Sequence, residues 1–151
     1  MIRKQVDKHH LQAIQPVERW VAIRASDEAL RLHVLEWSGA GQPFVLLHGL
    51  ASNANTWSAV GRTLAAQGYR VLAVDQRGHG RSDKPDTGYD FDTMGDDLYC
   101  LLEALGVESP VIAGQSWGGN VVLAYGARHQ RSARRLILVD GGFLDLQSRP
   151  D

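Results

Sequence analysis

The fold is decided by the stretch Val111-Ile112-Ala113-Gly114-Gln115-Ser116-Trp117-Gly118-Gly119-Asn120-Val121-Val122. An apolar run typical of a buried strand leads into a glycine-rich turn, and small and apolar residues then continue as a helix. Ser116 stands at the apex, inside a G-x-S-x-G pattern. So tight a turn strains the serine backbone and needs neighbours nearly free of side chains, which Gly114, Gly118 and Gly119 provide. The stretch therefore predicts an exposed serine oxygen at the start of a helix, where main-chain N–H groups can stabilise a developing negative charge.

The composition is that of an ordinary globular domain. The chain has 151 residues, of which 44% are hydrophobic and 22% charged, enough for one domain with a core. The formal net charge of −1 gives no reason to expect nucleic acid or an anionic membrane as a partner. No apolar run of transmembrane length and no signal peptide is recognised, so we expect a cytoplasmic protein without membrane contact. Cys100 is the only cysteine, which excludes a disulfide within the chain.

Metal and cofactor sites are not expected. His9 and His10 are adjacent, but no further ligand residues accompany them, and such a pair is usually solvated. We therefore expect neither a metal nor a cofactor.

The predicted elements form a β-hairpin followed by repeated strand–helix units. Residues 1–16 are interpreted as a loose lead-in, and residues 17–151 as part of one domain. Partial alternation over 17–25 and 30–37 predicts the hairpin. Wholly apolar runs, which predict strands covered on both faces, occur at 44–47, 71–74, 111–113 and 136–139. Helical spacing predicts helices over 57–65, from Asp92 to Leu105, and from the glycine-rich turn to His129.

This order indicates an α/β fold with a largely parallel sheet and helices on both faces. Right-handed crossovers bring the carboxyl ends of parallel strands to one edge of the sheet, where such folds bind ligands. We therefore expect the residues that end these strands to lie together at that edge. They are His48, Asp75, Ser116 and Asp140.

Three motifs, taken in order, make the chain resemble the α/β-hydrolase family. His48-Gly49 is similar to the oxyanion loop after the third strand, Asp75-x-Arg77-Gly78-x-Gly80-x-Ser82 to the loop after the fourth, and Gly114–Gly119 to the nucleophile elbow. The resemblance runs from about Val17 to Asp140 and implies an α/β-hydrolase fold that lacks its last strands. Asp75, Arg77 and His79 are interpreted as residues that shape their own loop.

The resemblance also implies a role for each site residue. Ser116 would be the nucleophile, and the main-chain N–H groups of Leu50 and Trp117 would form the oxyanion hole. Gly49 and Gln115 would border the substrate. His48 has two interpretations, one as part of the pocket floor and one, which we favour, as a residue that orients the loop by hydrogen bonds.

The serine indicates the chemistry. The epoxide hydrolase and haloalkane dehalogenase branches of the family attack with a carboxylate, which a serine cannot replace. Serine suits acyl transfer, so the substrate would be a small ester, lactone, thioester, amide or similar acyl compound.

The sequence contains no residue that we recognise as the general base. A serine hydrolase needs a histidine held by a carboxylate, and the family places that histidine after the last strand. None of the six histidines here follows a suitable strand, and a helix of about 12 residues is about 18 Å long, which carries His129 away from Ser116. Asp140 is a candidate for the acid; the alternative is an aspartate that caps its loop.

Several hypotheses follow. We expect the N-terminal half of a serine hydrolase, truncated before the catalytic histidine, with Leu136–Val139 left as an apolar, unpaired sheet edge. The alternative to truncation is a second chain, or a second copy of this one in a homodimer, that supplies the missing strands at this edge. Two other functions stay open: a non-catalytic protein that binds a small ligand in the same pocket, and an interaction module that uses the open edge.

Overall fold

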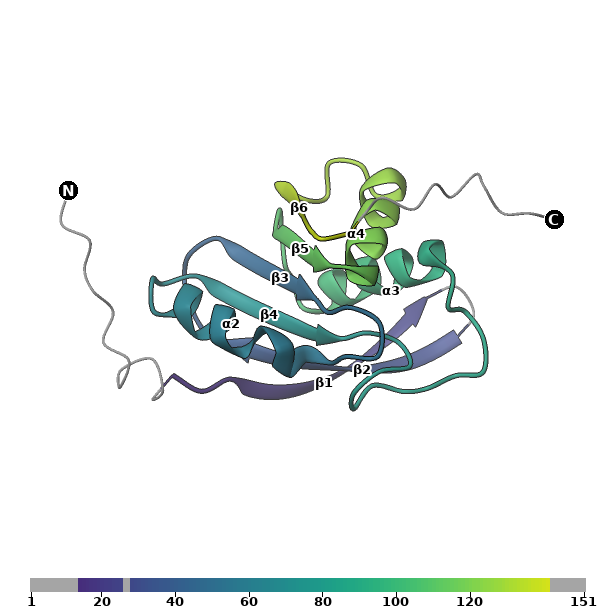
Figure 1. Cartoon of the computed structure of the whole chain (residues 1–151), viewed down its shortest axis with the longest axis horizontal. Helices are drawn as coiled ribbons and strands as arrows, with labels where there is room; N and C mark the ends of the chain where they lie inside the picture. The colour runs from purple at the N-terminus through teal and green to yellow at the C-terminus, as the bar shows by residue number, and fades with distance from the viewer. Residues whose placement is uncertain (1–13, 26–27, 142–151) are drawn as a thin grey trace.

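Residues 14–25 and 28–141 are described by a computed structural model of the chain (Figure 1). Most of the predicted lead-in, including His9 and His10, lies outside the described residues. None of the described helices is long and apolar enough to cross a membrane.

A six-stranded mixed sheet forms the centre of the described part of the chain, in the order β1-β2-β4-β3-β5-β6. The strands are β1 (Val17–Ala25), β2 (Glu28–Trp37), β3 (Pro43–Leu47), β4 (Arg70–Asp75), β5 (Val111–Gln115) and β6 (Arg135–Val139). Strands β1 and β2 form an antiparallel hairpin, and β2 also pairs antiparallel with β4. All remaining pairs are parallel. The predicted hairpin followed by a largely parallel sheet is confirmed.

Helices cover both faces of the sheet (Figure 1). They are the short 3₁₀ helix η1 (Ala54–Trp57) and the α-helices α2 (Ser58–Ala65), α3 (Phe91–Ala104) and α4 (Trp117–Arg128). Helix α2 packs against β4, while α3 and α4 pack against each other on the opposite face. Two separate apolar cores result, one around Trp37 and Leu46 and a larger one around Val45 and Leu101, because alternate residues of the buried strands point to opposite faces.

Helix α3 begins at Phe91, one residue earlier than predicted. Asp90 caps it: the carboxylate accepts hydrogen bonds from the Thr93 N–H at 2.9 Å and from the Thr93 hydroxyl at 2.8 Å. These bonds stabilise the first turn, so Asp92 lies inside the helix. Helix α4 begins immediately after Ser116 and ends at Arg128, with His129 as its C-cap.

The strand register brings the expected residues to one edge of the sheet. Leu47 pairs with Val74 on one side and with Gly114 on the other, and Gln115 pairs with Val139. The four residues named above therefore end or directly follow neighbouring strands at the same edge, as predicted. They are His48, Asp75, Ser116 and Asp140.

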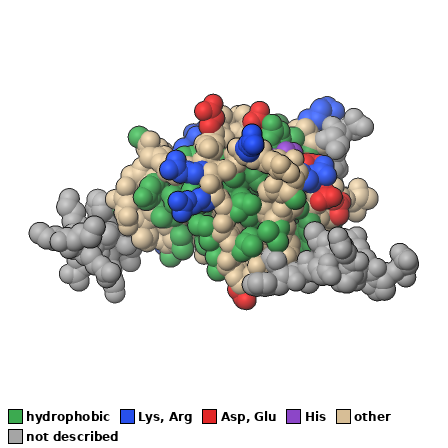
Figure 2. Space-filling model, turned by 90° about the horizontal axis from the view of Figure 1, so that it is seen from above, with side chains coloured by type: hydrophobic (Ala, Val, Ile, Leu, Met, Phe, Trp, Pro, Cys, Tyr) green, Lys and Arg blue, Asp and Glu red, His purple; other side chains and the backbone are tan. Residues whose placement is uncertain are grey.

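Strand β6 forms one border of the sheet and pairs, within the described residues, only with β5. The side chains of Leu136–Val139 are 39–42% exposed, so the predicted apolar edge is confirmed. Figure 2 views the molecule from the side on which β6 lies in Figure 1, and hydrophobic side chains gather across the centre of that face.

Candidate active site

Ser116 has the strained backbone that the sequence predicts. Its φ and ψ are 51° and −119°, in a region that residues other than glycine rarely adopt, and its side chain is exposed between β5 and α4. The surrounding backbone is closely packed. A Cβ atom at Gly118 would lie 2.5 Å from the carbonyl oxygen of His48, and one at Gly114 would collide with the carbonyl of Gly118. Side chains at these two positions are therefore excluded by neighbouring backbone.

The loop after β3 lies directly beside Ser116. A Cβ atom on Gly49 would stand 3.4 Å from Cβ of Ser116 and 3.2 Å from Oε1 of Gln115. The structure thus brings together Gly49, Gln115 and Ser116, three residues that the sequence assigns to the site.

Two main-chain N–H groups near this point have no acceptor among the described residues. Within the described part of the chain, the N–H groups of Leu50 and Trp117 donate no hydrogen bond to another backbone group. Trp117 is the first residue of α4, where N–H groups have no partner inside the helix. Leu50 follows Gly49 and turns its side chain to solvent, with 66% of it exposed. Free donors beside a serine are what an oxyanion hole requires.

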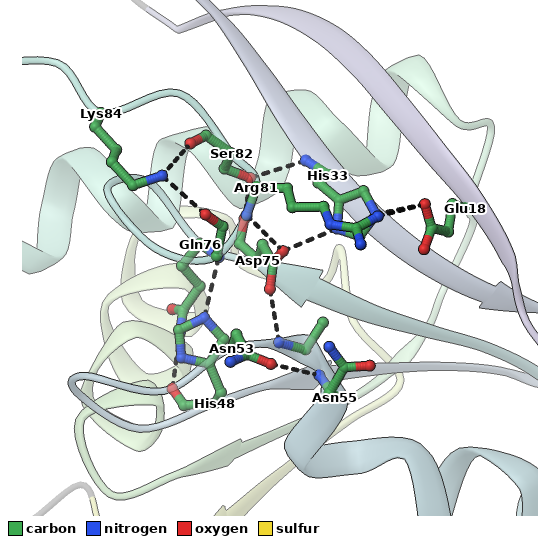
Figure 3. A network of polar contacts seen from close by, with 12 residues as sticks. Glu18, His33, His48, Asn53, Asn55, Asp75, Gln76, Arg81, Ser82 and Lys84 are labelled. Carbon is green, nitrogen blue, oxygen red and sulfur yellow. Dashed lines mark hydrogen bonds and ion pairs between the residues drawn. The ribbon is translucent and has the colours of Figure 1, made fainter.

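His48 is fully buried and uses both ring nitrogens within the protein (Figure 3). Nδ1–H donates to the carbonyl of Gly49 at 2.7 Å, and Nε2 accepts the main-chain N–H of Gln76 at 3.2 Å. Burial lowers the pKa of His48, although the bond to Gly49 opposes this shift. The two hydrogen bonds fit a neutral ring with its proton on Nδ1. These contacts favour the interpretation of His48 as a residue that orients the loop.

Asp75 does more than shape its own loop. Its carboxylate is buried and accepts three hydrogen bonds (Figure 3): Oδ1 from the N–H of Ala54 at 2.6 Å, and Oδ2 from the N–H of Arg81 at 2.9 Å and from Nδ1–H of His33 at 2.8 Å. The carboxylate therefore joins the loop after β3, the loop after β4 and strand β2. The sequence analysis missed His33; a histidine within a run of apolar strand residues was the signal that could have found it.

Arg77 and His79 hold the loop after β4 in place. The Arg77 guanidinium donates to the carboxylate of Asp97 in α3 and to the carbonyl of Thr87. Nδ1–H of His79 donates to the carbonyl of Arg77 at 2.9 Å, and the ring lies 5.5 Å, between ring centroids, from that of Trp117. Both residues shape the loop, as expected, but Arg77 also ties it to a helix.

The base of a catalytic triad is not found among the described histidines. No described side chain hydrogen-bonds to the Ser116 hydroxyl. His129, at the far end of α4, has its Nε2 2.7 Å from Asp96 and stacks on Tyr99, away from the serine as predicted. No group of described residues has the ligands for a metal ion.

Asp140 lies close to the elbow through the backbone. The N–H of Ser116 donates to the carbonyl of Val139 at 2.9 Å, and a Cβ atom on Gly141 would collide with the carbonyl of Ser116. Asp140 itself is exposed, with a φ of 49°. Its carboxylate forms no hydrogen bond with a described residue. The loop that follows, 142–151, lies outside the described residues, so the triad acid and the loop cap both stay predictions.

Comparison with known proteins places these features in context. A family model described as alpha/beta hydrolase fold matches residues 42–150. The AB hydrolase superfamily protein YisY of Bacillus subtilis is 37% identical over 113 residues, which cover 74% of this chain and 42% of that protein. The non-heme chloroperoxidase of Streptomyces lividans is 46% identical over 88 residues, covering 58% and 32%.

Solved structures of hydrolases are also similar to this chain. An esterase from Exiguobacterium antarcticum superposes with a TM-score of 0.75 at 35% identity, covering 82% of this chain and 46% of the esterase. An epoxide hydrolase, CorEH, is also similar. The chain thus spans less than half the length of each of these relatives.

Proposed function

The chain belongs to the α/β-hydrolase fold family, and from this premise we propose that it carries the nucleophile of a serine hydrolase. The substrate would be a small ester or another acyl compound, and the reaction would pass through an acyl-enzyme on Ser116. The observation that carries the proposal is the strained, exposed Ser116 beside Gly49, with the free N–H groups of Leu50 and Trp117 nearby.

The proposed reaction has two steps. The oxygen of Ser116 attacks the acyl carbon, its proton passes to a general base, and the carbonyl oxygen becomes an anion that the N–H groups of Leu50 and Trp117 stabilise. The bond to the leaving group then breaks, and the base returns the proton to it. Water attacks the acyl-enzyme in the same way, releasing the acid and restoring the serine.

The nucleophile separates this proposal from the epoxide hydrolase activity named among the relatives. Epoxide hydrolases attack through a carboxylate, which forms an ester with the opened epoxide, whereas Ser116 would have to form an ether that water does not readily cleave. The similarity to an esterase, at 35% identity, supports the acyl reaction.

We assign the general base to residues outside the described part of the protein. The rings of His33, His48 and His129 are held by other groups, and that of His79 is bonded to its own loop. Asp140 is the proposed acid, because it follows β6 where the backbone meets the elbow. In this proposal, a histidine placed between Asp140 and Ser116 completes the triad.

A second proposal concerns the sheet edge. The exposed apolar strand β6 favours pairing with another strand, either from the rest of the protein or from a second copy of this chain. This pairing would complete the sheet and bring further residues to the site.

Trapping of the acyl-enzyme tests the proposed function. The chain is incubated with p-nitrophenyl acetate, and acetylated residues are located by mass spectrometry. We expect acetyl-Ser116 to form slowly and then to persist, because no described histidine is placed to activate either the serine or the water that would hydrolyse the adduct. Ser109→Ala is a matched control, since Ser109 is also exposed with a positive φ of 49° but lies outside the site. Acetylation that persists unchanged in Ser116→Ala would refute the proposal.

A further inference from the structure

The end of strand β4 holds both ends of the loop that runs from His48 to Ala54, here called the oxyanion loop (Figure 3). At the far end, Oδ1 of Asp75 accepts the N–H of Ala54 at 2.6 Å. At the near end, Gln76 donates its main-chain N–H to Nε2 of His48 at 3.2 Å and its side-chain amide to the carbonyl of His48 at 2.7 Å. Asp75, the last residue of β4, and Gln76, which follows it, thus fix the loop after the neighbouring strand β3.

We propose that Asp75 and Gln76 are positioning residues that set where the N–H of Leu50 lies relative to Ser116. This inference rests on the proposed function, because the position of that N–H matters for an acyl reaction only if Ser116 is the nucleophile. Neither residue touches the substrate; each acts through the oxyanion loop.

The loop depends on these bonds because its middle has few other contacts. His48, Gly49 and Ala54 are buried at its ends, whereas Leu50 and Ala51 are exposed. No helix or strand includes residues 48–53. An N–H bonded to a buried carboxylate is among the stronger hydrogen bonds in proteins, so the end at Ala54 is held firmly.

His33 fixes the direction in which the Asp75 carboxylate points. Nδ1–H of His33 and the N–H of Arg81 both donate to Oδ2, which leaves Oδ1 for Ala54. Both side chains are about 97% buried, so water does not compete for these bonds. Nε2 of His33 lies 3.8 Å from the carboxylate of Glu18. The β1–β2 hairpin therefore supports the oxyanion loop from the far side of β4.

Asp75→Asn separates positioning from general stability. The asparagine keeps the shape of the side chain, but its NH₂ group would face the N–H of Arg81 and Nδ1–H of His33, which are donors already. If the amide turns round, the NH₂ group faces the N–H of Ala54 instead. The first orientation costs two hydrogen bonds and the second costs one, so we expect the second, in which the N–H of Ala54 loses its acceptor.

Asp83→Asn is the matched control. Like Asp75, Asp83 accepts a main-chain N–H through its carboxylate; the donor is the N–H of Arg31 in β2, at 2.8 Å. Asp83 lies in the same loop as Arg81. It is exposed, however, and has no hydrogen bond to the oxyanion loop. Its replacement removes the same charge and leaves the proposed positioning bonds in place.

The experiment combines two measurements on the wild-type chain and on both variants. Amide hydrogen exchange reports on residues 48–57, and labelling of Ser116 by a fluorophosphonate in the presence of imidazole gives a maximal rate and a half-saturating concentration. For Asp75→Asn we expect exchange at Ala54 to rise about tenfold and the maximal labelling rate to fall about tenfold at unchanged half-saturation, because a donor to the anion is displaced. Asp83→Asn should match the wild type in both.

The outcomes distinguish this inference from the proposed function. Exchange that stays unchanged at 48–57 in Asp75→Asn, or that rises equally throughout the sheet, overturns the positioning role. If the wild-type chain is not labelled at Ser116 but exchange at 48–57 still rises locally in Asp75→Asn, the proposed function is refuted. The hydrogen bonds from Asp75 and Gln76 would then still hold the oxyanion loop. If Asp75→Asn does not fold, Gln76→Ala removes the amide bond to His48 alone. It should raise exchange locally at 48–50, and no rise there overturns the inference.

Discussion

Arg77 donates from Nε and Nη2 to the two carboxylate oxygens of Asp97, at 2.7 and 2.9 Å, with both side chains almost fully buried. Replacing Asp97 would remove the buried carboxylate that both of these guanidinium nitrogens bind. We therefore expect Asp97→Ala to lower the free energy of unfolding by about 3–5 kcal/mol, measured by urea denaturation.

The neighbouring pair is the control for that prediction. Arg128 bonds both oxygens of Asp96 in the same two-pronged manner, but at the surface. Water screens this pair, so Asp96→Ala should cost much less than Asp97→Ala. Equal losses in the two variants would contradict the argument from burial.

The elbow glycines give a second prediction, on helix α4. A Cβ atom at Gly118 would lie 2.5 Å from the carbonyl oxygen of His48 and 2.7 Å from that of Leu47, and backbone in a central strand cannot move away. We expect Gly118→Ala to reduce stability by about 1–3 kcal/mol, despite the better helix propensity of alanine.

Gly126 lies on the same helix and serves as its control. A Cβ atom there would meet only the Leu136 side chain, mainly Cδ1, which is the end of a flexible and partly exposed side chain. Gly126→Ala should therefore be close to neutral or slightly stabilising. Urea midpoints of the two variants measure the contrast, and a Gly118→Ala variant as stable as Gly126→Ala would show that the elbow is not closely packed.

The local features of the site could be predicted from the sequence, because their constraints act over a few residues. Gly114, Ser116 and Gly118 are close in sequence, and the need for a side-chain-free turn is visible in the pattern itself. The apolar run in β6 likewise predicted a strand, and its place as the last predicted strand indicated an edge.

The polar contacts that support the site could not be predicted in this way. His33 bonds to Asp75 across 42 positions, and Arg77 to Asp97 across 20. Which charged residues meet depends on strand order, and the sequence pattern does not specify that β2 pairs with β4. The start of α3 depended on a similar choice: Asp90 and Asp92 are both suitable caps, and the extended backbone at Asp90 decides between them.

A pH dependence follows from the burial of His48. Burial lowers its pKa from the usual 6.5, so the unfolded chain binds the proton more tightly than the folded one. The contribution of the neutral ring to stability is therefore complete above about pH 6.5 and is lost as the pH falls below it. This contribution should change by at most about 1.4 kcal/mol per pH unit.

His48→Gln isolates this contribution. Glutamine offers a donor and an acceptor but does not titrate, so the stability of the variant should depend less on pH. The difference in free energy of unfolding between wild type and variant should shrink between about pH 7 and pH 5. A difference that stays constant would mean that His48 does not titrate differently on folding.

The edge strand predicts association of the chain. Ile137 lies in the middle of β6, is 42% exposed and is next to Leu136, whose side chain contacts α4. Successive residues of a strand point to opposite faces, so Ile137→Lys places a charge on the edge without disturbing α4. We expect concentration-dependent dimers of the wild-type chain in analytical ultracentrifugation and monomers of the variant. A wild-type chain that stays monomeric at all accessible concentrations contradicts this prediction.

The most direct test of the account is the reaction of Ser116 with a fluorophosphonate, whose phosphorus is attacked as an acyl carbon would be. The chain is labelled with and without imidazole in solution, which substitutes for a base that the described histidines do not supply, and the modified residue is located by mass spectrometry. We predict slow labelling of Ser116 alone, an increase of about a hundredfold or more with imidazole, and none in Ser116→Ala. A folded chain in which Ser116 stays unlabelled even with imidazole would contradict the assignment of Ser116 as the nucleophile.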